Sequence, residues 1–227
     1  MRPDEREDQR YANEDFCKVS KEERMMLSLL KKTIAELGLP NDVVHVLDIG
    51  CGSGRISKQL QDFGYHVTGL DFSEEAVKKA VARGIEAKRA NLDEGIPLPD
   101  ATFHIVWAGD IVEHVFDPIG LLRESGRVLK PGGAMIITIP SDVGLVSRIK
   151  MLFGISHQEG MYITSGFYKH HTFFTPRLIR FMLKKAGLHV TDFLTVLIIG
   201  QRRILVRYLP SILFNEMVIR AKKPAEL

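Results

Sequence analysis

The chain of 227 residues is 45% hydrophobic and 26% charged, which suits one α/β domain with a sizeable core and argues against a disordered chain. A net charge of +3 is too small to indicate a nucleic-acid partner, so we expect none. The two cysteines lie far apart in sequence, which argues against a disulfide framework or a zinc site. Because the amino terminus is charged and no apolar run could span a bilayer, the sequence predicts a cytoplasmic protein without a membrane span.

The first part of the chain contains a charged arm and then a helix. Residues 1–20 carry many charges of both signs and are expected to be flexible, although Tyr11 or Phe16 could make this arm a lid over a cofactor. Apolar residues at helical spacing predict a helix over 21–37. We expect residues 21–227 to form a single domain.

The strongest pattern is a short apolar strand that ends in a glycine-rich turn and continues into a helix, over residues 46–57. Gly50, Gly52 and Gly54 alternate there; glycine allows positive φ and lets backbone N–H groups approach a ligand. A strand, a glycine turn and a helix are typical of a nucleotide-binding loop, although the pattern also fits an ordinary tight turn. Asp48 lies inside the strand, where its carboxylate could hold an ammonium group.

Two further strands are predicted after this loop. The first, over 65–71, ends at Asp71, which is placed to contact a ribose hydroxyl. Phe72 follows, and its ring could lie against an adenine or belong to the core. The second strand is expected over 85–90.

Strand and helix continue to alternate beyond this point. Strands are predicted over 103–108 and 134–139, with a helix over 117–129 between them. Five such alternations with short connections predict parallel βαβ units and helices on both faces of the sheet. Ligands bind at the carboxyl ends of such strands. Those ends hold Gly50, Asp71, Asn91, Gly109, Asp110 and Pro140.

The last third departs from this pattern. Residues 141–172 contain a basic amphipathic piece and a loop, and we expect them to form a substrate-cap insertion. A helix over 175–187 and a strand over 190–199 are predicted next. The arginine-rich stretch 202–209 indicates a short basic connector before a final strand over 213–221.

Several motifs together resemble those of the class I S-adenosylmethionine-dependent methyltransferases, and they are similar to the small-molecule branch that includes the quinone-biosynthesis enzymes. The motifs lie at 46–55, 69–73, 97–106, 113–115 and 127–133. The resemblance implies a Rossmann-like, seven-stranded and mostly parallel sheet with helices on both faces and an antiparallel last strand.

The resemblance also implies a binding site for S-adenosyl-L-methionine. The expected cofactor contacts are Asp48, Gly50, Gly52, Gly54, Asp71, Phe72, Asn91, Leu92 and Gly109. In this family an acidic residue after the third strand usually bonds the adenine amino group. Here Asn91 takes that place, because its amide oxygen can accept the same hydrogen bond, and Asp93 is the alternative.

Methylation of a phenol or alcohol needs a base, and histidine suits this role near neutral pH. His114 and His171 are the expected catalytic residues, with His170 and Asp110 as further candidates. In the quinone methyltransferases a motif similar to Asp110, Glu113 and His114 is associated with a divalent cation such as Mg²⁺, so a metal site is a further hypothesis. The alternative is that Glu113 and His114 only satisfy backbone groups in a turn.

The predicted function is therefore transfer of a methyl group from S-adenosylmethionine to a small molecule, with O-methylation of a phenolic, quinone-like or lipid-like acceptor expected. One alternative is a nicotinamide-dependent oxidoreductase, which the missing G-x-G-x-x-G spacing disfavours. Another is a partner protein that binds S-adenosylmethionine without catalysis. Basic amphipathic segments at 145–153 and 202–209 are more typical of core helices, but they also allow peripheral contact with a membrane.

Overall fold

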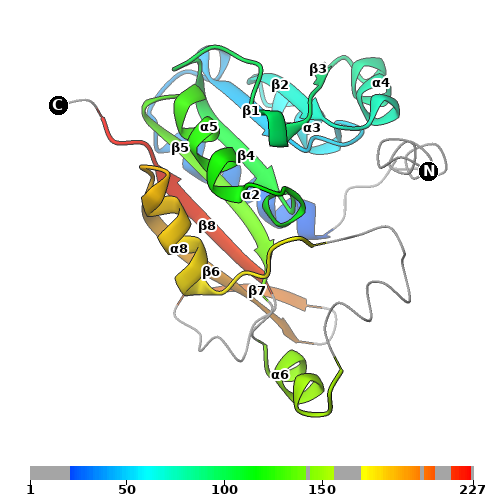
Figure 1. The fold of residues 1–227 in the computed structure, drawn as a ribbon. Coiled ribbons are helices and arrows are strands. Elements are labelled where there is room, and N and C mark those ends of the chain that lie inside the picture. The colour runs from blue at the N-terminus through cyan, green and yellow to red at the C-terminus, as the bar shows by residue number, and fades with distance from the viewer. Residues whose placement is uncertain (1–20, 142–143, 156–169, 200–201, 208–215, 226–227) are drawn as a thin grey trace.

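The computed structural model describes residues 21–141, 144–155, 170–199, 202–207 and 216–225 (Figure 1). The α-helices are α2 (Lys21–Ala35), α3 (Arg55–Asp62), α4 (Glu74–Ala82), α5 (Pro118–Val128), α6 (Leu145–Leu152) and α8 (Pro176–Lys185). Short 3-10 helices are η1 (Asn41–Val43), η2 (Leu92–Glu94) and η3 (Val112–His114). The strands are β1 (His45–Ile49), β2 (His66–Asp71), β3 (Glu86–Arg89), β4 (Phe103–Gly109), β5 (Leu129–Pro140), β6 (His189–Ile199), β7 (Arg202–Arg207) and β8 (Glu216–Lys222). The predicted arm over 1–20 and part of the predicted cap lie outside the described residues.

The strands form one mostly parallel sheet in the order β3-β2-β1-β4-β5-β8-β6-β7. Strands β1 to β5 pair in parallel, and the last strand, β8, inserts antiparallel between β5 and β6. The predicted α/β class and the antiparallel last strand are confirmed. The sequence order of strands reverses between β1 and β4, which is where ligands bind in folds of this kind.

In the described part of the chain the sheet has eight strands, one more than the seven that were predicted. The additional strand is β7, which was expected to be a basic connector. It pairs antiparallel with β6 from Leu194 opposite Arg207 to Ile199 opposite Arg202. Strand β7 lies on the edge of β6 that faces away from β8, where it pairs with backbone groups of β6 that would otherwise be unpaired. In the sequence, the arginines of β7 suggested a basic connector, although the aliphatic residues between them favour a strand.

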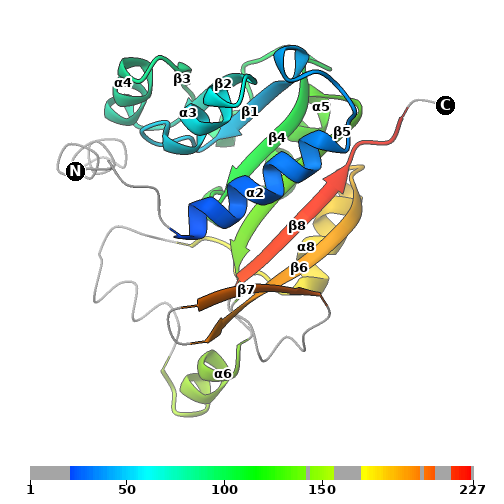
Figure 2. The same cartoon turned by 180° about the vertical axis from the view of Figure 1, so that it is seen from behind.

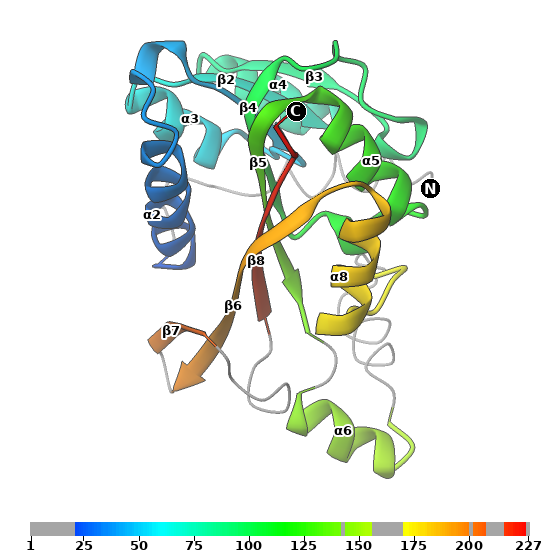
Figure 3. The same cartoon turned by 90° about the vertical axis from the view of Figure 1, so that its left-hand side faces the viewer.

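Helices cover both faces of the sheet. Figures 2 and 3 show α2 and α3 on one face and α5 and α8 on the other. Alternate residues of each strand point to opposite faces, so Val46 packs with Leu30 of α2 while Leu47 packs on the side of α5. Two apolar cores on either side of the sheet hold the strand ends in place.

Side-chain caps begin three of the described α-helices. Ser73 Oγ accepts a hydrogen bond from the Ala76 amide (3.1 Å) at the start of α4. Asp117 caps α5 by accepting from the amide of Gly120 (2.9 Å), with proline in the first turn. Thr175 caps α8 in the same way. Such caps stabilise a helix by about 1 kcal/mol each and fix where it begins.

Helix α6 differs from the other helices in its surroundings. All three views show it beyond the end of β5, away from the helices that pack on the sheet (Figures 1–3). Its apolar side chains and those just after it are exposed: Leu145, Ile149, Met151, Leu152, Phe153 and Ile155. Within the described ranges, α6 and every other helix fall short of the length and apolar character needed to cross a membrane.

Candidate active site

The loop between β1 and α3 has the backbone geometry that its glycines allow. Gly50, Gly52 and Gly54 all have positive φ, at 74°, 54° and 78°. The amides of Gly50 and Cys51 donate to the carbonyl of Leu70, at 2.7 and 3.0 Å, which ties the loop to the end of β2. Because L side chains rarely adopt positive φ, this loop path depends on glycine.

The glycine loop also packs tightly against the segment that follows β4. A Cβ atom at Gly50 would lie 2.9 Å from Ile111 Cγ1, closer than real carbon contacts allow. Ile111 is the residue directly before η3, so the glycine loop contacts the connection between β4 and η3.

Asp71 is held in place at the end of β2 by backbone amides. Its Oδ2 accepts from the Gly52 amide (2.8 Å) and its Oδ1 from the Ser73 amide (2.9 Å), and the residue is only 8% exposed. A carboxylate fixed in this way suits a ribose hydroxyl, which is the predicted role.

Asp48 lies under the glycine loop with 2% of its surface exposed. The Ser57 hydroxyl donates to its Oδ2 at 2.5 Å. Burial, with a smaller contribution from the charge of Asp71, raises the pKa of Asp48 to about 7, against the opposing effect of Ser57. A cation bound here would favour the ionised carboxylate. Ser57 was missed by sequence reasoning; the available signal was its position in the first turns of the helix after the loop.

The predicted adenine contacts follow β3. Asn91 Oδ1 accepts from the Asp93 amide (3.2 Å), and its Nδ2 donates to Glu94 (2.8 Å), so this side chain caps η2. One lone pair of the amide oxygen stays available for a ligand. Leu92 is buried. Asp93, the alternative contact, instead accepts from the amide of Phe116 at 2.7 Å.

Two further predicted cofactor residues have structural neighbours of their own. Phe72 is half-buried, and the Arg89 guanidinium lies over its ring, 5.6 Å from the ring centre. A Cβ atom at Gly109 would lie 2.7 Å from the Trp107 ring, so packing alone requires glycine there. Their contacts with a cofactor stay predictions.

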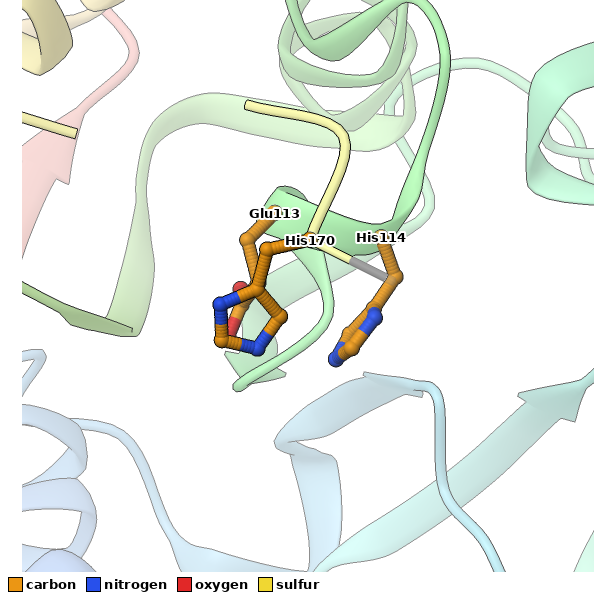
Figure 4. Close-up of side chains that lie close together, drawn as sticks. All are labelled: Glu113, His114 and His170. Carbon is orange, nitrogen blue, oxygen red and sulfur yellow. The ribbon is translucent and has the colours of Figure 1, made fainter. Parts of the chain in front are cut away.

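A carboxylate and two imidazoles meet at the carboxyl end of β4. Glu113 and His114 come from η3 and His170 from the segment before α8, and one possible ligand atom from each lies within 4.8 Å of the others (Figure 4). Glu113 is 1% exposed, and the two rings are edge-on with centres 4.8 Å apart. Two neutral imidazoles and a carboxylate are a common ligand set for a divalent transition metal.

The other predicted residues of this region lie outside that group. His171 stacks on Phe116 with ring centres 4.1 Å apart, so the structure brings His170, and not the expected catalytic His171, to His114. Asp110 has a φ of 50° and accepts from the Thr138 hydroxyl at 3.1 Å. Spacings of three and four residues would put Asp110, Glu113 and His114 on one face of a helix, but η3 begins only at Val112, so Asp110 lies outside it.

Comparison with known proteins extends these observations. A family model described as a methyltransferase domain matches residues 47–137. The chain is 27% identical over 164 residues to a ubiquinone biosynthesis O-methyltransferase of Xylella fastidiosa, an alignment that covers 68% of this chain and 64% of that protein. It is 31% identical over 172 residues to the mitochondrial ubiquinone biosynthesis O-methyltransferase of Homo sapiens, covering 71% of this chain and 46% of that protein. The chain thus spans less than two thirds of the length of either relative.

The fold of this chain is also similar to that of a solved structure. The crystal structure of an S-adenosylmethionine-dependent methyltransferase from Methanosarcina mazei superposes with a TM-score of 0.63 at 25% sequence identity, covering 85% of this chain and 98% of that one. These likenesses and the geometry of the glycine loop favour the methyltransferase interpretation over the nicotinamide-dependent alternative.

Proposed function

Because the chain belongs to the class I S-adenosylmethionine-dependent methyltransferases, we propose that it transfers a methyl group to a hydroxyl oxygen of a small phenolic, quinone-like or lipid-like acceptor. The observation that carries this proposal is the Glu113, His114 and His170 group beside the glycine loop. It places candidate bases and metal ligands at the strand ends, where the reaction would take place.

The residues around the glycine loop suit the proposed cofactor. The Asp71 carboxylate is fixed by two backbone amides and would accept from ribose hydroxyls. Asp48 would accept from the ammonium group, and Asn91 with Leu92 would line the adenine site. S-Adenosylmethionine supplies an activated methyl group on a sulfonium. The protein has to hold the acceptor in line with that group, and such positioning contributes much of the rate enhancement.

The presence of histidines in this group favours an acceptor oxygen that must be deprotonated. A phenol or alcohol must lose a proton as it attacks, whereas a carboxylate needs no base. We propose that His114 takes this proton, with the adjacent His170 ring sharing the role or binding a metal. The buried Glu113 carboxylate would balance the positive charge that develops there.

We also propose a metal-bound state, in which Glu113, His114 and His170 hold a divalent cation and His114, now a ligand, no longer acts as the base. The two imidazoles favour Zn²⁺, Co²⁺, Fe²⁺ or Mn²⁺ over Mg²⁺, which prefers oxygen ligands. Such a cation lowers the pKa of a hydroxyl bound to it. The three side chains come from two separate segments, and the hydrogen bond from the His171 amide to the Glu113 carbonyl (2.8 Å) joins those segments.

The test is a transfer assay with S-adenosylmethionine labelled with deuterium in its methyl group. The acceptors are a catechol, a simple phenol, a benzoate and a benzylamine, each with Mg²⁺, Mn²⁺ or Zn²⁺, and the product is identified by mass spectrometry. Labelled methyl ether from the catechol or phenol, lost in His114→Ala but kept in the surface variant Asp62→Ala, would support the proposal. Methylation of the benzoate or benzylamine alone would contradict it, and binding of S-adenosylhomocysteine without any transfer would favour the partner-protein alternative.

We further propose that the segment 144–155 makes peripheral contact with an anionic lipid surface. Besides its exposed apolar side chains, the segment carries the basic residues Arg148 and Lys150, and it contains no acidic residue. Leu152 and Phe153 are 83% and 78% exposed. An amphipathic helix with basic residues beside its apolar side chains binds such surfaces, and a lipid-like acceptor would be reached there.

A further inference from the structure

Two neighbouring histidines in the segment that precedes α8 contact different partners. His170 joins the Glu113 and His114 group, with its ring centre 4.8 Å from that of His114. His171 stacks on Phe116, with ring centres 4.1 Å apart and planes inclined by 29°. Because the two residues are adjacent in the chain, the position of one ring constrains the position of the other.

Phe116 is held at its backbone although its side chain is 74% exposed. Asp93 Oδ1 accepts from the Phe116 amide (2.7 Å) and from the Asp117 amide (3.4 Å). Asp117 in turn caps α5. An aromatic ring that is largely exposed adds little to the core, so its close stack with His171 is its principal described contact.

The same segment is attached at a second point. The amides of His171 and Thr172 both donate to the Glu113 carbonyl, at 2.8 and 3.4 Å. These bonds fix the distance between this segment and η3. They act on backbone atoms, and the stack on Phe116 adds a side-chain contact at His171, the residue next to His170.

We propose that Phe116 is a positioning residue: through its stack with His171 it holds the His170 imidazole in place beside Glu113 and His114. This inference rests on the proposed function, in which that group binds a metal and the acceptor hydroxyl. Phe116 itself is not one of the three residues of that group. Residues that orient metal ligands in this way typically contribute tenfold to a hundredfold to metal affinity.

The experiment compares Phe116→Ala and Phe116→Leu, which remove the ring, with Phe116→Tyr, which keeps it. Phe181→Ala is the matched control, because Phe181 is also an exposed phenylalanine but lies on α8. The first readout is the nuclear Overhauser effect between the ring protons of His114 and His170 in metal-free protein with labelled histidine. The second is the affinity for Co²⁺, followed by its visible absorption. S-Adenosylhomocysteine affinity shows that each variant is folded.

We expect Phe116→Ala and Phe116→Leu to lose the His114–His170 signal and to bind Co²⁺ tenfold to hundredfold more weakly, while Phe116→Tyr and Phe181→Ala match the wild type. An unchanged ring signal in Phe116→Ala would overturn the inference, whatever the Co²⁺ affinity. If wild-type protein binds no Co²⁺, the proposed metal site fails, and the ring signal alone then decides whether Phe116 positions His170. An increased KM for the acceptor with an unchanged ring signal would mean that Phe116 contacts the acceptor, and this would also overturn it.

Discussion

The hydroxyl of Ser57 donates a 2.5 Å hydrogen bond to the buried carboxylate of Asp48, directly beneath the glycine loop. Burial raises the pKa of this carboxylate to about 7, and the bond from Ser57 opposes the rise. The group is therefore close to half ionised near neutral pH. Its charge would respond to a cation placed in the loop, such as the ammonium group of the proposed cofactor.

This raised pKa predicts a pH-dependent effect on stability. The pKa of Asp48 is 3.8 when the group is free and about 7 in the folded protein. Protonated Asp48 therefore favours the folded state. This contribution to the free energy of unfolding is complete below pH 4 and is lost as the pH rises to about 7. The resulting loss in the free energy of unfolding is at most about 4 kcal/mol above pH 7. We expect Asp48→Asn to raise the free energy of unfolding relative to wild type more at pH 8 than at pH 5, as measured by urea denaturation. A difference that does not change with pH would contradict the ionisation described here.

The same group should make cofactor binding depend on pH. We expect the affinity for S-adenosylhomocysteine to increase as the pH rises to about 7 and then to level off, because the ionised Asp48 binds the ammonium group better. Ser57→Ala removes the bond that lowers the pKa of Asp48, so the midpoint should move to higher pH. Calorimetric titration between pH 5.5 and 8.5 checks both, and a midpoint unchanged in Ser57→Ala would be the contrary result.

Replacing Asp71 should abolish cofactor binding without unfolding the protein. Two charge-assisted hydrogen bonds to ribose hydroxyls would be lost, which corresponds to roughly a hundredfold or greater loss of affinity. We expect Asp71→Ala to show this loss in calorimetry with S-adenosylhomocysteine while its circular dichroism stays that of the wild type. Asp62→Ala, an acidic residue exposed at the end of α3, is the control. Unchanged affinity in Asp71→Ala would show that the ribose contact has been assigned wrongly.

Gly50 should be intolerant of a side chain for two separable reasons. Its φ of 74° strains any L residue by about 1–2 kcal/mol, and a Cβ atom would also press on Ile111. Gly84 has a similar φ of 82° with open space around its Cβ position, so Gly84→Ala measures the strain alone. We expect Gly50→Ala to lose more stability than Gly84→Ala in thermal unfolding and, unlike it, to lose S-adenosylhomocysteine binding. If Ile111→Ala, added to Gly50→Ala, restores neither stability nor binding, the contact with Ile111 is not the cause of the loss.

Removing His170 should weaken transition-metal binding. We expect calorimetric titration of wild-type protein to give tighter binding of Zn²⁺ and Co²⁺ than of Mg²⁺, and His170→Ala to lose at least tenfold in Zn²⁺ affinity because one of three protein ligands is gone. His189→Ala removes an exposed histidine at the start of β6 and should change nothing. Tight Mg²⁺ binding that survives in His170→Ala would point to an oxygen-only site instead.

The segment 144–155 should bind anionic vesicles. We expect wild-type protein to sediment with vesicles that contain phosphatidylglycerol more than with pure phosphatidylcholine, since each basic residue near such a surface contributes about 1 kcal/mol. Replacing Arg148 and Lys150 by glutamine should remove that preference, and Leu152→Ser with Phe153→Ser should remove binding altogether. The variant Val81→Ser, at an exposed apolar position on α4, is the control. Equal sedimentation of all the variants would contradict the proposal.

Sequence alone determined the elements whose signals are local. Alternating glycines after a buried strand fixed the turn at Gly50, and the acidic residue at the end of the next strand gave Asp71. Both depend on neighbours along the chain: positive φ requires glycine, and the carboxyl ends of parallel strands lie on one edge of a sheet. Caps such as Ser73 and Asp117 are local features of the same kind, because a cap acts within three residues of its own position.

The tertiary structure decided what depends on contacts between distant segments. It brought His170 to His114 and turned the adjacent His171 onto Phe116, although the sequence favoured His171. It also made β7 a strand, because the edge of β6 opposite β8 is open for pairing. Spacing in the chain cannot give these results, since 56 positions separate His114 from His170 and their meeting depends on how the intervening strand and helix pack.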